Sequence, residues 1–195
     1  MPARGHSMST AISASEAYER CESITRTQAA NFYYGIRLLP HDRRRAMCAA
    51  YAFARRVDDI GDGDLERAEK LRLLDQSERD LEALEQDGGD PSSSLDPVIV
   101  ALVDAHARFS LPAGALGDLI EGVRMDVNGV AYESFDELVL YCRRVAGAIG
   151  RVCLAIFGAP RPGARDQFIP RLRRSPARDR TPSASRASFS RWSGI

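Results

Sequence analysis

The sequence predicts an all-α protein, built as one helical domain with appendages. Apolar residues recur at spacings of three and four through most of the chain, and the alternating β-branched runs that indicate strands are almost absent. Capping residues, glycines and prolines divide this pattern into helix-length segments. With 195 residues, of which 44% are hydrophobic, the chain is long enough to form a hydrophobic core.

The first two predicted helices are separated by a proline. The first begins near Ser15, a suitable N-cap, and runs through Leu38, because the residue before Pro40 is disfavoured in helical geometry. The second covers residues 41–60 and ends at two nearby glycines. Its buried face is expected to contain Met47, Ala50, Ala54 and Val57.

A third helix is predicted after Asp64, which serves as its cap, with acidic residues in its first turn. A loop rich in Gly, Pro and Ser follows over residues 87–94. The apolar stripe of this helix is expected to contain Leu65, Ala68, Leu71, Leu74, Leu81 and Leu84.

Three further helices complete the predicted domain. Prolines after Asp96 and Leu111 suit the first turns of two of them, which we expect to end near Phe109 and Asn128. The last helix covers residues 135–157, because Ser134 and Glu137 form a capping box before it and a glycine follows it.

The character of the sequence changes after Arg165. Residues 166–195 contain seven Arg, two Asp and three Pro without an apolar period. We therefore divide the chain into a disordered N-terminus (1–14), a helical domain (15–165) and a disordered tail rich in Arg, Ser and Pro (166–195). We expect the tail to arise from a shifted reading frame, or the domain to be truncated at this point.

Composition excludes several classes of protein. No apolar stretch is long enough to span a membrane, and no apolar core of a secretory signal is present, so we expect a cytoplasmic protein. The 27 basic and 27 acidic residues hide an asymmetry, because residues 166–195 carry a net charge of +5 and the rest of the chain −5. We expect no nucleic-acid partner, and binding of nucleic acid by the basic tail is a minor alternative. The spacing of the four cysteines does not suit zinc, and free, buried packing roles are expected for Cys21, Cys48, Cys142 and Cys153.

An acidic cluster at the end of the second predicted helix is the main candidate for chemistry. Asp58 and Asp62 lie four residues apart and share a helix face with Arg55 and Tyr51. Two carboxylates at this spacing suit Mg²⁺, which also takes water and phosphate oxygens, and an adjacent arginine suits phosphate.

Two other interpretations of this cluster are open. One is a solvated helix end, in which Arg55 and Arg56 neutralise the aspartates through surface ion pairs. The other is a calcium-binding loop from Asp58 to Glu69, in which Ile60 occupies a position that needs an oxygen ligand.

Three segments carry a resemblance to a known family. They are FYYGIRLLP at residues 32–40, YAFARRVDDIGD at 51–62 and YCRRVAGAIG at 141–150. Together they resemble the squalene and phytoene synthases, which join two prenyl diphosphates head to head. The resemblance covers residues 17–160, and within the family the chain looks most like bacterial presqualene diphosphate synthases of hopanoid pathways.

The resemblance implies an all-α isoprenoid-synthase fold and a role for each matching residue. Asp58 and Asp62 would hold Mg²⁺ on a diphosphate, Asp59 would support them, and Arg55 and Tyr51 would contact phosphate or the developing cation. Substrate-binding roles are implied for Phe32, Asp126, Tyr141, Val145, Ala146 and Ile149. The family's second aspartate-rich motif would lie beyond Pro160 and is not recognisable there, so the domain is expected to be incomplete at its C-terminus.

The implied activity is the Mg²⁺-dependent condensation of two farnesyl diphosphates to presqualene diphosphate. The alternatives are a phytoene synthase acting on two geranylgeranyl diphosphates and an inactive fragment that retains only prenyl-diphosphate binding. A lipophilic product makes peripheral contact with a membrane compatible with either activity. The oligomeric state is not predicted by the sequence.

Overall fold

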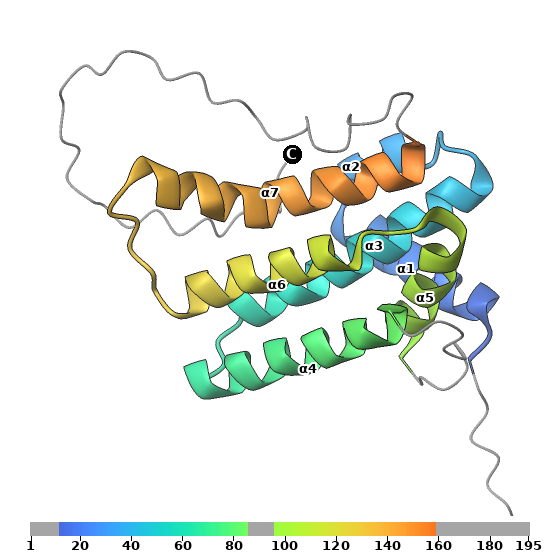
Figure 1. Ribbon diagram of the computed structural model, residues 1–195. Helices are drawn as coiled ribbons and strands as arrows, with labels where there is room; N and C mark the ends of the chain where they lie inside the picture. The colour runs from blue at the N-terminus through green and yellow to red at the C-terminus, as the bar shows by residue number, and fades with distance from the viewer. Residues whose placement is uncertain (1–11, 86–95, 159–195) are drawn as a thin grey trace, which may run out of the picture.

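The computed structural model describes residues 12–85 and 96–158, which form seven α-helices and no β-strand (Figure 1). The predicted all-α class is therefore confirmed. The helices are α1 (Ala14–Gln28), α2 (Ala30–Ile36), α3 (His41–Asp62), α4 (Arg67–Glu85), α5 (Pro97–Phe109), α6 (Ala113–Val127) and α7 (Phe135–Phe157). The predicted loop over 87–94 and the predicted tail over 166–195 lie outside the described residues.

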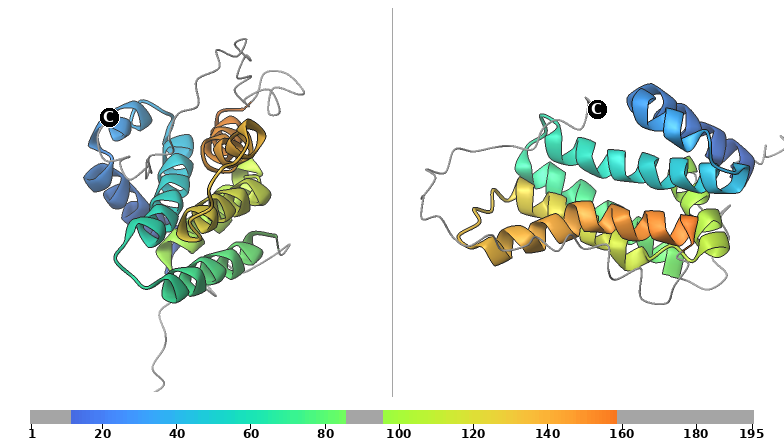
Figure 2. Two further views of the ribbon diagram at one scale, coloured as in Figure 1. Left: turned by 90° about the vertical axis from the view of Figure 1, so that its left-hand side faces the viewer. Right: turned by 90° about the horizontal axis from the view of Figure 1, so that it is seen from above.

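Helix α3 lies at the centre of the bundle and contacts each of the other described helices. Both views in Figure 2 show α3 between the α1–α2 pair and the α6–α7 pair. The predicted buried face is confirmed, and small side chains on it allow the neighbouring helices to approach closely. Buried residues of α3 include Ala46, Met47, Ala49, Ala50, Ala54 and Val57.

The single first helix predicted through Leu38 is wrong, because the chain leaves helical geometry at Ala29 (φ −136°, ψ 54°). Helix α1 also begins earlier than predicted, at Ala14, with Ser13 and Glu16 forming a capping box. Neither glycine nor proline marks the break. It allows α2 to turn so that Ile36, 3% exposed, packs in the core.

The start of α4 also differs from the prediction. The helix begins at Arg67, so Asp64 is not its cap, and Leu65 and Ala68 are exposed. Farther along, Leu74, Leu81 and Leu84 are buried as predicted, where α4 packs against its neighbours. The apolar period of the sequence therefore extends beyond the part of the helix that has packing partners.

The last three predicted helices are confirmed, with boundaries within one residue. The Asp96 side chain accepts from the Val98 N–H at 2.9 Å and caps α5. Ser134 and Glu137 form the predicted capping box of α7, and Gly158 follows this helix with φ +76°. No helix among the described residues is both long and apolar enough to cross a membrane.

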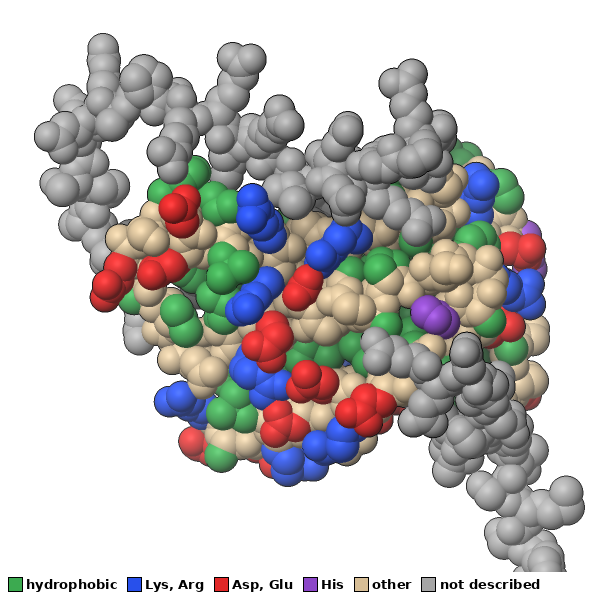
Figure 3. Space-filling model, viewed as in Figure 1, with side chains coloured by type: hydrophobic (Ala, Val, Ile, Leu, Met, Phe, Trp, Pro, Cys, Tyr) green, Lys and Arg blue, Asp and Glu red, His purple; other side chains and the backbone are tan. Residues whose placement is uncertain are grey.

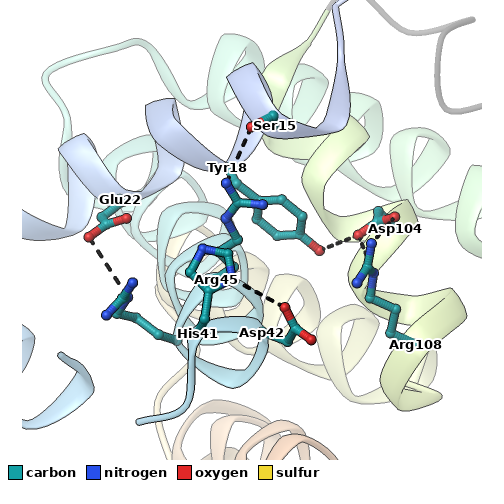
Figure 4. Close-up of polar contacts among 9 residues, drawn as sticks. Ser15, Tyr18, Glu22, His41, Asp42, Arg45, Asp104 and Arg108 are labelled. Carbon is teal, nitrogen blue, oxygen red and sulfur yellow. Dashed lines mark hydrogen bonds and ion pairs between the residues drawn. The ribbon is translucent and has the colours of Figure 1, made fainter. Parts of the chain in front are cut away.

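A partly buried polar network joins α1, α3 and α5 (Figure 4). The Tyr18 hydroxyl donates to Asp104 at 2.7 Å, and Asp104 also accepts from Arg108. The Arg45 guanidinium lies 5.3 Å from the centre of the Tyr18 ring and donates to Ser15. Burial, with the nearby Asp104 carboxylate, raises the pKa of Tyr18, so this tyrosine stays a hydrogen-bond donor at neutral pH.

Ion pairs join α4 to α6 on the face shown in Figure 3, where acidic and basic side chains intermingle. Arg124 of α6 contacts Asp75 and Glu78 of α4 at 2.5 and 3.0 Å and Glu121 of its own helix at 2.8 Å. The cysteine prediction holds for Cys21 and Cys48, which are buried. It is wrong for Cys142, which is exposed on α7, and Cys153 is only partly buried.

Arg56 joins α3 to α5 by donating two hydrogen bonds to Asp96, at 2.6 and 2.8 Å. Burial raises the pKa of Asp96, but the hydrogen bonds and charge of Arg56 and the N–H groups at the start of α5 outweigh it. The pKa of Asp96 is therefore below its ordinary value. The stabilisation that the Arg56–Asp96 pair gives the fold is fully present above the pKa that Asp96 has in the unfolded chain. It is lost as the pH falls through the pKa that Asp96 has in the folded protein.

We expect Asp96→Asn to lower the free energy of unfolding by about 1 kcal/mol at pH 7. Asparagine retains an oxygen that can cap α5, so the loss reports the charge of the pair with Arg56. Denaturant titrations of both proteins at pH 7 and near pH 3 should show the difference shrinking in acid. A difference that is equal at both pH values would mean that the ionised carboxylate is not its source.

Candidate active site

The last three turns of α3 carry the polar face predicted from the sequence. Tyr51, Arg55 and Asp58 are half-buried on this face, and Asp62 is exposed at its end. The Gly63 N–H donates to the Asp59 carbonyl at 3.0 Å and closes the helix. These helical turns keep Asp58 and Asp62 in the same helix, which contradicts the calcium-loop interpretation because such a loop is not helical.

Asp58 is held in an environment that opposes its charge. Burial, together with the negative charge of Asp62, raises the pKa of Asp58 to about 6. Arg55 opposes this rise, while Asp59 and Asp126 add to it. A cation placed beside Asp58 would relieve both the burial cost and the repulsion among the carboxylates.

Asp126 and Tyr141 join this cluster from α6 and α7. The Tyr141 hydroxyl donates to the Asp126 carboxylate at 2.8 Å. Burial and the charge of Asp62 raise the pKa of Asp126, and the Tyr141 hydrogen bond opposes that rise. The structure therefore brings together four of the predicted residues, Asp58, Asp62, Asp126 and Tyr141, from three helices.

Two glycines allow these helices to approach closely. A Cβ atom at Gly61 of α3 would lie 2.7 Å from Val123 of α6, and one at Gly122 of α6 would lie 2.6 Å from Val145 of α7. Neither position could hold a larger side chain without a shift of the neighbouring helix. Gly61 and Gly122 thus bring Asp126 and Tyr141 close to the end of α3.

The solvated-helix interpretation holds for one arginine only. Arg55 pairs with Asp59 at 2.7 Å, but Arg56 points to Asp96 of α5 and does not neutralise the cluster. The Arg55 Nε atom is buried and has no hydrogen-bond partner within the described residues. Arg55 therefore retains an unused donor beside Asp58.

The predicted apolar residues lie on two sides of α3. The Phe32 ring of α2 lies 5.9 Å from the Tyr51 ring, and 46% of Phe32 is exposed. On α7, Val145 and Ile149 are half-buried and Ala146 is exposed. Figure 2 shows α2, which carries Phe32, and α7 on either side of α3.

Two residues of the site were not predicted from the sequence. The Lys70 ammonium of α4 donates to the Gly61 carbonyl at 2.7 Å and complements the C-terminal end of α3. The Tyr132 ring lies 5.2 Å from the Tyr141 ring. Lys70 is the only lysine among the basic residues, which is a signal in the sequence, whereas nothing there distinguishes Tyr132.

The donor set suits a hard divalent cation. Within residues 12–85 and 96–158, no three His, Cys, Asp or Glu side chains converge as a complete metal site. Mg²⁺ does not require one, because it is bound through one or two carboxylates and completed by water and substrate phosphate. Asp58 and Asp62, with their unfavourable mutual charge, fit that requirement.

Comparison with known proteins identifies the family. The family model described as "Squalene/phytoene synthase" matches residues 25–175 of this chain. The chain belongs to the squalene/phytoene synthase family. This family consists of prenyltransferases, so the resemblance to the family is confirmed. The closer resemblance to presqualene diphosphate synthases is not, because the curated relatives with 48% and 41% identity are phytoene synthases.

Individual members of the squalene/phytoene synthase family share substantial identity with the chain. A phytoene synthase of Mycobacterium tuberculosis is 48% identical over 143 residues, which are 73% of this chain and 45% of the relative. A phytoene synthase of Arthrospira platensis is 41% identical over 167 residues, covering 83% of this chain and 52% of the relative. The chain spans about half the length of these curated relatives.

A solved structure within the squalene/phytoene synthase family confirms the fold. The squalene synthase HpnC from Alicyclobacillus acidocaldarius matches with a TM-score of 0.68 and 29% identity, covering 78% of this chain and 56% of that one. The described helices therefore adopt the isoprenoid-synthase fold that the resemblance implied.

Proposed function

We propose that this chain is part of a Mg²⁺-dependent enzyme that condenses two geranylgeranyl diphosphates head to head, as phytoene synthases do. The proposal rests on the carboxylate cluster of Asp58, Asp62 and Asp126, built from α3 and α6 in a member of this family. The names of the relatives with 48% and 41% identity favour this substrate over farnesyl diphosphate.

The residues at the end of α3 supply the polar half of the chemistry. Asp58 and Asp62 would hold Mg²⁺, which when bound neutralises the negative charge that develops on a departing diphosphate. Asp59 keeps Arg55 in place through their ion pair. The Arg55 guanidinium, with its unused Nε donor, is suited to bind a phosphate oxygen beside Asp58.

Aromatic and aliphatic side chains supply the apolar half. The paired rings of Phe32 and Tyr51 lie next to the acidic cluster and can stabilise a positive charge on the substrate. Val145, Ala146 and Ile149 provide an apolar surface on α7 that suits a prenyl chain and excludes water. The Tyr141–Asp126 hydrogen bond fixes the polar edge of that surface.

Condensation of two farnesyl diphosphates to presqualene diphosphate is the second candidate. This was the activity implied first by the sequence resemblance, and the 29% identity to a solved squalene synthase supports it. The two candidates use the same polar site and differ in the length of the prenyl chain.

Binding and turnover measurements test both candidates. We would titrate the chain with thio-analogues of geranylgeranyl and farnesyl diphosphate, with and without Mg²⁺, and analyse the products formed from the two natural substrates. Mg²⁺-dependent binding that is tighter for the longer analogue, with phytoene as product, is the expected result. Product from farnesyl diphosphate alone would support the second candidate, and absence of Mg²⁺-dependent binding would contradict both.

A further inference from the structure

Helix α2 is too short to be held in place by its own hydrogen bonds. It has seven residues, and no side chain caps its N-terminus at Ala29. Its position therefore depends on contacts with other helices. Ile36, at its C-terminal end, packs in the core and supplies one of these contacts.

A second contact ties α2 to α1. The Tyr33 hydroxyl donates to the Glu22 carboxylate of α1, and the Tyr33 ring packs against the hydrophobic core. Arg26 lies 5.2 Å from the centre of the Tyr33 ring and donates to its hydroxyl at 3.2 Å. The Arg44 Nε atom of α3 lies 4.0 Å from the Glu22 carboxylate. We call Glu22, Arg26, Tyr33 and Arg44 the Glu22 cluster, which joins α1, α2 and α3.

The charge of Glu22 strengthens this contact. The hydrogen bond from Tyr33 holds the pKa of Glu22 below its ordinary value, and Arg44 and Arg26 add to the effect while burial opposes it. Glu22 is therefore ionised at neutral pH, and a hydrogen bond to an ionised carboxylate is stronger than one between neutral groups. Only 23% of the Glu22 side chain is exposed, so water competes little for it.

The helical period directs neighbouring side chains of α2 to different helices. Around the helix axis, Ile36 lies between Phe32 and Tyr33 on the inner side of α2. Tyr34 lies on the opposite side and is 63% exposed. Tyr33 contacts α1, and the Phe32 ring lies 5.9 Å from the Tyr51 ring of α3. Fixing Tyr33 therefore also fixes the rotation of α2 and the place of the Phe32 ring.

We propose that Glu22 is a positioning residue that sets the orientation of α2, and with it the Phe32 ring, through its hydrogen bond to Tyr33. The inference rests on the proposed function, in which the paired rings of Phe32 and Tyr51 contact the substrate beside the acidic cluster. Without the Glu22 contact, α2 can turn about Ile36 and the two rings separate. The carboxylates of α3 belong to another helix and keep their places, so only the apolar half of the site is affected.

A tryptophan in place of Phe32 reports the position of this ring without substrate or Mg²⁺. The chain has a single tryptophan, Trp192, so Trp192→Phe provides a background without tryptophan emission. In that background, Phe32→Trp places an indole beside Tyr51. Adding Glu22→Ala or Tyr33→Phe should shift its emission to the red and increase its quenching by acrylamide, because the indole becomes more exposed. A loss of global stability alone would not change the emission of the folded protein.

Two matched controls remove the same chemical groups from neighbouring positions. Glu19 is an exposed glutamate of α1, and within residues 12–85 and 96–158 it makes no hydrogen bond or ion pair. The Tyr34 hydroxyl of α2 likewise makes no hydrogen bond within these residues. Glu19→Ala and Tyr34→Phe should therefore leave the indole emission unchanged.

The combination of variants decides whether the two side chains act as a unit. Glu22→Ala together with Tyr33→Phe should change the emission no more than either substitution alone, because both remove the same hydrogen bond. Emission that neither substitution changes would overturn the proposal, as would equal changes in Glu19→Ala and Tyr34→Phe.

Ligand binding tests the consequence for the site. With Mg²⁺, Glu22→Ala and Tyr33→Phe should weaken binding of the geranylgeranyl diphosphate thio-analogue by about tenfold. Binding of inorganic diphosphate, which contacts only the polar half of the site, should be unchanged, and equal weakening of both ligands would overturn the proposal. Failure of the wild type to bind the analogue would contradict the proposed function, whereas the fluorescence measurement would still decide whether Glu22 positions α2.

Discussion

Replacing Asp58 by asparagine is expected to stabilise the protein and to abolish its Mg²⁺-dependent binding of prenyl diphosphates. Asp58 has a pKa of about 6 because burial and Asp62 oppose its charge. Above pH 7 the ionised carboxylate therefore costs the folded state about 3 kcal/mol, which an uncharged amide of similar shape avoids. The binding loss should be at least about 100-fold, larger than the usual effect of an outer-shell partner.

The pH dependence of stability gives an independent test. Because the folded-state pKa of Asp58 is raised, this residue binds its proton more tightly in the folded protein than in the unfolded chain. Its contribution therefore makes stability decrease as the pH rises from about 4 to about 6, and then level off. In thermal melts without metal, the melting temperature of the wild type should fall across this pH range relative to that of Asp58→Asn.

Asp62→Asn separates the effect of the acidic cluster on stability from its effect on Mg²⁺-dependent binding. Asp62 is exposed, so its replacement should change stability little directly, while removing its charge should move the pKa of Asp58 downward. Binding of the diphosphate analogue should still be lost if both carboxylates hold the metal. If Asp58→Asn lowers the melting temperature and leaves analogue binding intact, the environment and the role assigned to Asp58 are both wrong.

Gly122→Ala is expected to lower the free energy of unfolding by about 2 kcal/mol, although alanine is the better helix former. The added Cβ atom would lie 2.6 Å from the Val145 Cγ2 atom. Valine is stiff about χ1, so α7 must move away from α6 to relieve the overlap. That movement would also displace Tyr141 from Asp126 and weaken analogue binding.

Gly117→Ala is the matched control, because Gly117 lies on the same helix and a Cβ atom there meets nothing within 4 Å. This variant should gain about 0.5–1 kcal/mol from helix propensity. Adding Val145→Ala to Gly122→Ala should recover part of the lost stability in a double-mutant cycle. Additive effects of the two substitutions would argue against a direct overlap between these side chains.

The sequence predicted the candidate site well where the chemistry lies within one helix. Asp58, Asp62, Arg55 and Tyr51 share a face because the helical period places residues three and four apart on the same side. The capping box of α7 and the Asp96 cap were likewise local, and the structure has both. Substrate length is the exception, because the names of the relatives favour the geranylgeranyl alternative over the farnesyl substrate first implied.

Only the tertiary structure decided the features that depend on packing between two helices. The break at Ala29 has no local signal and follows from the packing of Ile36 in the core. The exposure of Leu65, whose spacing matches the buried stripe of α4, follows from the absence of a packing partner around it in the described residues.

The sequence by itself determined the helical class, most helix boundaries and the polar face of α3, because capping chemistry and a 3.6-residue period are local properties. Only the tertiary structure decided that Arg56 pairs with Asp96 rather than with the acidic cluster, and that Asp126 and Tyr141 join it. The raised pKa of Asp58 also depends on the fold, because burial and the field of neighbouring carboxylates exist only once α3 and α6 are packed together.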